Sequence, residues 1–149
     1  NVSLSSLRSL RRGVFVDRDG EVARTKSIVD ELRIKAQTLE QPVGTLSGGN
    51  QQKVVLGKML LTQPKVLLLD EPTRGIDVGA KLEVYELINR LTAAGQAIVL
   101  VSSELGELLG MSDRIVMLCE GRIGGTFERP EATPERLLAA AMGRLEHAA

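Results

Sequence analysis

The sequence has 149 residues, enough for one compact domain, and nineteen Lys and Arg residues balance nineteen Asp and Glu residues to a formal net charge of zero. This neutral charge, with only two Phe, one Tyr and no Trp, argues against a nucleic-acid partner. A single Cys and a single His exclude an intramolecular disulfide and metal sites of the usual Cys and His spacings.

Helices dominate the pattern of the first 62 residues. Leucines at threefold spacing predict a short amphipathic helix over residues 4–12, and a second helix is expected over residues 25–35. After a loop rich in Pro and Gly, residues 51–61 predict a third helix, with Val54, Val55, Met59 and Leu60 toward the core. We treat residues 1–62 as one helical subregion.

Strands alternate with helices in the second subregion, residues 63–149. The apolar run at 66–69 is typical of a strand buried on both faces, and the next helix has Leu82, Tyr85, Ile88 and Leu91 at threefold spacing. The remaining expected elements are a strand at 97–101, a helix at 104–109, strands at 115–118 and 123–127, and a helix that Thr133 caps and that ends near residue 142. The alternation predicts an α/β fold with a mainly parallel sheet and flanking helices.

The segment Leu46–Lys53 (LSGGNQQK) is the first candidate for a binding site. Ser47 is placed to cap the helix that follows, and Gly48 and Gly49 carry no Cβ, so backbone N–H groups can approach an anion closely. Such a helix start attracts a negative group, and the γ-phosphate of a nucleotide is the obvious candidate. Taken alone, the same residues are also explained as a capped turn.

Two adjacent acids, Asp70 and Glu71, follow the apolar run directly. The carboxyl ends of strands are where open α/β sheets place their ligand sites. Asp70 fits the carboxylate that holds Mg²⁺, and Glu71 fits the residue that positions and polarises an attacking water. A solvated loop start is the alternative for the pair taken alone.

The order and spacing of LSGGNQQK, VLLLDEP and Gly75–Asp77 resemble the signature motif, Walker B strand and D-loop of ABC-type ATPases. The strings DEPTRGIDVGAK and VSSELGELLGMSDRI resemble more narrowly the C-terminal ATPase half of the tandem ATP-binding subunits of monosaccharide importers, of the ribose, galactose and xylose kind. The resemblance runs from Leu46 to about Gly125. It implies a partial P-loop NTPase domain.

In this family, ATP is held between two ATPase units, and each unit lends its signature to the nucleotide of the other. The resemblance therefore implies that Ser47, Gly48, Gly49 and Gln51 face the γ-phosphate of a partner's nucleotide. Asp70, Glu71 and Asp77 would serve this unit's own site and the interface, with ATP and Mg²⁺ bound. The implied partners are the N-terminal ATPase half of the same polypeptide, membrane permease subunits and, through them, a periplasmic sugar-binding protein, at the cytoplasmic face of the bacterial inner membrane.

The sequence departs from the family pattern in two places. It contains no Gly-x-x-x-x-Gly-Lys-Ser/Thr phosphate loop, because its only Gly-Lys pair, Gly57-Lys58, is followed by Met59. We therefore expect a C-terminal fragment that is inactive by itself and that exposes apolar surface on the strand at 66–69. Ser103 stands where the family usually has a histidine that contacts the γ-phosphate, which implies a weak or inactive hydrolytic site on this half.

Two other functions are compatible with these motifs. A cytosolic ABC-type ATPase that moves no solute, such as a translation factor or a DNA-repair ATPase, shares the signature and Walker B motifs. A non-catalytic half that only lends its signature and interfaces is the second alternative, which Ser103 and the missing phosphate loop favour.

Overall fold

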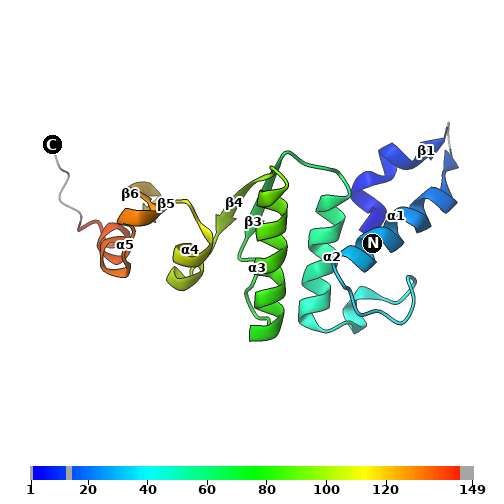
Figure 1. Cartoon of the computed structure of the whole chain (residues 1–149), viewed down its shortest axis with the longest axis horizontal. Coiled ribbons are helices and arrows are strands. Elements are labelled where there is room, and N and C mark those ends of the chain that lie inside the picture. The colour runs from blue at the N-terminus through cyan, green and yellow to red at the C-terminus, as the bar shows by residue number, and fades with distance from the viewer. Residues whose placement is uncertain (1, 13–14, 145–149) are drawn as a thin grey trace. The chain divides into compact units, whose positions relative to one another are not determined.

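The computed structural model describes residues 2–12 and 15–144, and the chain divides into two compact units, residues 1–99 and 100–149 (Figure 1). Among the described residues, no helix combines the length and the apolar character that crossing a bilayer requires.

The first unit begins with helices, as the sequence predicts. The elements are the 3₁₀ helix η1 (Val2–Leu10), the strands β1 (Arg11–Arg12) and β2 (Phe15–Val16), and then α1 (Arg18–Glu31), η2 (Val43–Thr45) and α2 (Gly48–Leu60). η1 packs against both α1 and α2. Helix α1 begins at Arg18 rather than near residue 25, because the Asp17 side chain caps it by accepting a hydrogen bond from the Gly20 N–H at 3.1 Å.

The buried face of α2 differs from the predicted one. Val54 and Leu60 are buried as expected, whereas Val55 and Met59 are exposed. The rest of the buried face consists of Gly49, Lys53, Leu56 and Gly57. A pattern based on apolar side chains missed this face because two glycines and a lysine form much of it.

Strands β3 (Val66–Asp70) and β4 (Ala97–Val101) are hydrogen-bonded neighbours, and α3 (Val78–Ala93) connects them. The Ala97 N–H donates to the Lys65 carbonyl at 3.1 Å, so both strands begin at the same edge of the sheet. This is the parallel arrangement with a helical crossover that the alternation predicts. On α3, Ile88 is buried as expected, but Leu82 is exposed and the other buried side chains are Val84 and Leu87.

Strand β3 is buried on one face only. Leu67 and Leu69 are buried, whereas Val66 is 52% exposed and Leu68 is 67% exposed. The prediction of burial on both faces is therefore wrong, because among the described residues packed side chains cover only the face on which Leu67 and Leu69 lie. The expectation of exposed apolar surface on this strand is confirmed.

The second unit contains α4 (Leu105–Met111), the antiparallel pair β5 (Arg114–Cys119) and β6 (Arg122–Glu128), η3 (Arg129–Glu131) and α5 (Pro134–Ala141). Glu120 and Gly121 both have positive φ, which suits the tight two-residue turn between β5 and β6. The Thr133 hydroxyl caps α5 as predicted, accepting from the Arg136 N–H at 3.3 Å. The core of this unit is formed by Ile115, Phe127, Leu137 and Ala140.

Gly124 on β6 supplies the first testable prediction, because a Cβ at this position would collide with the backbone carbonyl of Ala140 on α5. We expect Gly124→Ala to lower the free energy of unfolding by about 1–3 kcal/mol. Gly106→Ala is the matched control, since nothing lies within 4 Å of a Cβ there. Gly106 is inside α4, so alanine should stabilise the helix by about 0.5–1 kcal/mol. Urea denaturation of the two variants measures the difference, and equal midpoints would contradict the assigned contact.

Candidate functional site

Ser47 occupies the N-cap position of α2, as the sequence predicts, but its hydroxyl does not cap the helix. The Ser47 Oγ instead accepts a hydrogen bond from the Asn50 side-chain amide at 2.8 Å. The Asn50 Oδ1 in turn accepts from the Lys35 backbone N–H at 2.9 Å. The predicted capping bond is wrong because Asn50 engages the hydroxyl, and the helix start is held by a side-chain bridge to the preceding loop.

The Gln51 side chain also turns back toward the preceding loop, since its Nε2 donates to the Leu46 carbonyl at 2.8 Å. Its backbone N–H donates to the Ser47 carbonyl at 2.9 Å, which is the first bond of the helix. These bonds fix the loop that leads into α2. The role of Gln51 toward a nucleotide stays a prediction.

The two glycines of the motif lie in different surroundings. Gly48 is exposed, and the atoms nearest to an added Cβ would be the Ile76 Cγ2 at 3.9 Å and the Gly75 carbonyl oxygen at 4.0 Å. Gly49 is buried, and a Cβ there would lie only 2.7 Å from the Cβ of Ala80 on α3. Gly49 is thus required by the close approach of α2 to α3, whereas Gly48 leaves open space beside the D-loop.

Asp77 begins α3, and its Oδ1 accepts a hydrogen bond from the Ala80 N–H at 3.0 Å. This cap places the D-loop beside the start of α2. Residues of both segments line one hollow of about 210 Å³, namely Lys35, Ser47, Gly49, Asn50, Lys53, Asp77, Gly79, Ala80 and Glu83. The predicted residues Ser47, Gly49 and Asp77 line this hollow together, whereas Gly48 and Gln51 are not among its lining residues.

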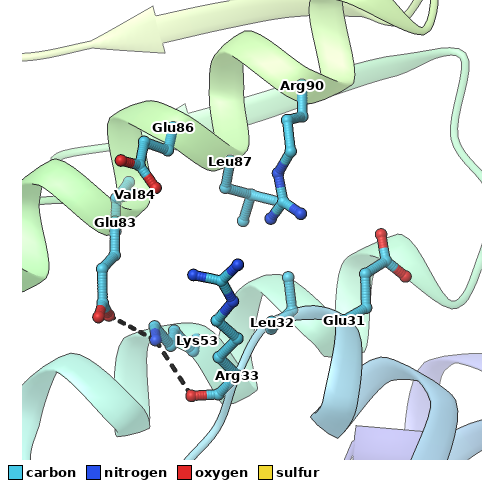
Figure 2. Close-up of a pocket in the computed structure, with 9 residues that line it drawn as sticks. All are labelled: Glu31, Leu32, Arg33, Lys53, Glu83, Val84, Glu86, Leu87 and Arg90. Carbon is cyan, nitrogen blue, oxygen red and sulfur yellow. Dashed lines mark hydrogen bonds and ion pairs between the residues drawn. The ribbon is translucent and has the colours of Figure 1, made fainter.

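Lys53 is the last residue of the predicted segment Leu46–Lys53, but the sequence reasoning gave it no role of its own. It is only 6% exposed, and its Nζ lies 2.5 Å from the Oε2 of Glu83 on α3. The same Nζ donates to the Arg33 carbonyl at 3.3 Å, as Figure 2 shows. The sequence did contain one indication of a role for Lys53: it lies four residues after Gly49, which places both residues on one face of α2.

The two acids after β3 differ in their surroundings. Asp70 is exposed at the end of the strand, and Glu71 is half-buried. Glu71 has φ of +47°, a left-handed conformation that costs a non-glycine residue of order 1–3 kcal/mol and that clusters at functional sites. The sequence did not predict this strain.

No group of three His, Cys, Asp or Glu side chains arranged for a metal is found among the described residues. A metal ion held by Asp70 alone would take its other ligands from water and substrate. Mg²⁺ binds in this way in phosphate sites, where one or two carboxylates suffice. The single exposed carboxylate at the end of β3 fits that requirement.

Ser103 belongs to the second unit, where it is exposed in the segment before α4. The Oγ of the neighbouring Ser102 accepts a hydrogen bond from the Glu104 N–H at 3.0 Å. The contribution of Ser103 to a nucleotide site stays a prediction.

Comparison with known proteins finds one matching family model and several similar proteins. Residues 4–74 match the ABC transporter family. The chain is 58% identical over 143 residues to a xylose import ATP-binding protein of Moorella thermoacetica, with 96% of this chain and 28% of that protein aligned. It is 53% identical over 144 residues to a ribose import ATP-binding protein of Rhodopirellula baltica, with 97% of this chain and 28% of that protein aligned. The chain thus spans less than a third of the length of these curated relatives.

Solved structures of ABC transporters share the fold. The alignment with a dimeric bacterial ABC transporter cassette covers 86% of this chain and 54% of the cassette's chain, with a TM-score of 0.72 and 22% identity. The alignment with a chain of an inward-facing metal-chelate type ABC transporter covers 94% of this chain and 56% of the transporter chain, with a TM-score of 0.80 and 17% identity. The predicted fold class, a partial ABC ATPase domain of mixed helix and sheet, is confirmed.

The contact between Gly49 and Ala80 supplies a prediction about stability. We expect Gly49→Ala to lower the free energy of unfolding by about 1–3 kcal/mol, because the two helices must separate to admit a methyl group. Gly48→Ala should change it by much less, since its added Cβ meets only ordinary contacts at 3.9 Å or more. Combining Gly49→Ala with Ala80→Gly removes the clash and should recover part of the loss. Chemical denaturation of the parent chain and the three variants measures these free energies of unfolding. If the double variant is no more stable than Gly49→Ala, the contact is contradicted.

Proposed function

We propose, from the premise that this chain belongs to the ABC transporter ATPase family, that it forms part of a subunit whose ATP hydrolysis energises monosaccharide import. The chain would lend its signature, Ser47 to Gln51, to a nucleotide held by a partner ATPase unit. The observation that carries the proposal is the meeting of signature and D-loop residues at one hollow beside the exposed start of α2. Backbone N–H groups at a helix start favour a phosphate there.

The acids after β3 would serve the nucleotide site on this half. Glu71 would orient a water molecule and accept its proton as the water oxygen bonds to the γ-phosphorus and the bond to ADP breaks. Asp70 would hold Mg²⁺, which offsets negative charge on the phosphates. The strained conformation of Glu71 supports a specific task for this side chain.

A monosaccharide of the pentose kind is the substrate class that the relatives support, since their names specify xylose and ribose import. We propose the N-terminal ATPase half of the same polypeptide and membrane permease subunits as direct partners. A periplasmic sugar-binding protein would act through the permease. The site of action would be the cytoplasmic face of the bacterial inner membrane. Within the chain, residues 1–62 would form the helical subregion and residues 63–149 the Walker B subregion.

A non-catalytic role for this half is the second candidate function, and Ser103 favours it. A serine hydroxyl is short and carries no positive charge, so it replaces a histidine poorly at a γ-phosphate. In this version, the chain completes the partner's site through its signature while its own site hydrolyses ATP slowly.

The chain by itself provides the first test. Its 149 residues contain no phosphate loop, so the backbone cradle and the lysine that bind the phosphates are absent. We expect no Mg²⁺-dependent binding at micromolar concentrations when the chain is titrated with a fluorescent ATP analogue. Saturable micromolar binding that ATP competes away would refute this expectation.

A second test separates the signature from the Walker B site in a complete subunit assembled with its permease. Because Ser103 favours a slow site on this half, we expect Gly48→Ala, which affects the partner's site, to lower ATP turnover more than Glu71→Gln does. Gly48 is preferable to Gly49 for this purpose, since a Cβ at Gly49 also disturbs the packing of α2 on α3. Steady-state ATPase rates show which of the two variants loses more activity. A larger loss in Glu71→Gln would show that the site on this half is the competent one.

A further inference from the structure

We propose that Lys53 is a positioning residue that fixes the signature helix α2 and the D-loop helix α3 in one register through its ion pair with Glu83. The consequence for catalysis rests on the proposed function, in which the signature and the D-loop act at nucleotide sites. The structural part of the proposal concerns only how α2 and α3 are joined.

The surroundings of Lys53 hold its ammonium group in place. The residue is buried, and its Nζ contacts the Glu83 carboxylate at 2.5 Å and the Arg33 carbonyl at 3.3 Å (Figure 2). A buried charge must keep such partners, because leaving it without them is costly. Arg33 has φ of +50°, so the chain that follows α1 adopts a rare conformation where it presents its carbonyl to Lys53. The ammonium thus joins three segments, namely α2, α3 and the chain after α1.

The ion pair lies one helical turn from the contact between Gly49 and Ala80. Gly49 and Lys53 are four residues apart on α2, and Ala80 and Glu83 are three residues apart on α3, so each pair occupies one helix face. A single close contact would allow the helices to pivot about it. A second contact about 5–6 Å further along, one turn of helix, opposes that rotation.

This register bears directly on the candidate site. Ser47 precedes α2 and Asp77 caps α3, so the relative placement of the two helices sets the relative placement of these residues. Lys53 and Glu83 line the same hollow as Ser47 and Asp77. Loss of the ion pair should therefore loosen the candidate site without removing any group proposed to contact the nucleotide.

Hydrogen exchange in the 149-residue chain tests the structural part. We expect Lys53→Met to raise the exchange rates of backbone amides in the first half of α2 and at the start of α3 about tenfold, since opening becomes easier. Lys53→Arg keeps a positive charge and should restore most of the protection. Lys58→Met is the matched control, because Lys58 is an exposed lysine on the same helix. Unchanged exchange in Lys53→Met, or equal changes in the control, would overturn the proposal.

ATPase kinetics of the complete assembled subunit test the catalytic part. We expect Lys53→Met to lower kcat about tenfold or more, since small misplacements in an active site have effects of this size, while KM for ATP changes less than about twofold. Lys53→Arg should recover much of kcat, and Lys58→Met should behave as the parent protein. A purely stabilising role would instead lower the folded fraction and leave kcat per folded molecule unchanged, which would overturn the positioning role.

The two measurements also separate failure of this proposal from failure of the proposed function. If the parent assembly hydrolyses no ATP, the proposed function fails, and hydrogen exchange still decides whether Lys53 joins α2 and α3. If the parent assembly is active and Lys53→Met retains its kcat and its exchange protection, the positioning role fails alone.

Discussion

The close approach of α2 to α3 is the constraint on which the arrangement of the first unit's site depends. The helices can touch because Ala80 has only a methyl side chain and Gly49 has none. Lys53 and Glu83 then meet one turn further along. Because α2 begins at the signature and α3 begins at the D-loop, a packing contact between two helix faces determines which loops become neighbours. Gly49 therefore has a requirement imposed by the fold in addition to any imposed by a nucleotide.

Element types and the α/β class were predictable because apolar periodicity and capping residues are local signals. Thr133, for example, caps α5 through its hydroxyl as its sequence context indicated. The buried face of α2 was not predictable in the same way, since Gly49, Lys53 and Gly57 are not apolar side chains. The start of α1 was missed because Asp17 is a cap without a strong apolar repeat behind it. Burial of one face of β3 rather than both depends on which elements pack against the sheet, which is not a local property.

The candidate site was predictable in its residues more than in its geometry. Motif order placed Ser47, Gly49 and Asp77 in one functional group, and in the structure all three line a single hollow. The hydrogen bonds of individual side chains depend on which nearby groups are available as partners, and the motifs do not specify these partners. Asn50 takes the Ser47 hydroxyl away from the helix cap, and Leu46 holds the Gln51 amide. Lys53 was missed because its importance comes from Glu83, which lies thirty residues further along the chain.

The left-handed backbone at Glu71 sets the stability of the fold against the chemistry proposed for its carboxylate. Asparagine and glycine adopt this conformation more easily than glutamate, so replacements that remove the carboxylate also relax the backbone. A laboratory selection for heat resistance alone would consequently favour the loss of this acid, and a consensus drawn from stabilised variants would conceal its value. Under the proposed function, glutamate at this turn is retained by selection for the proposed task of its carboxylate.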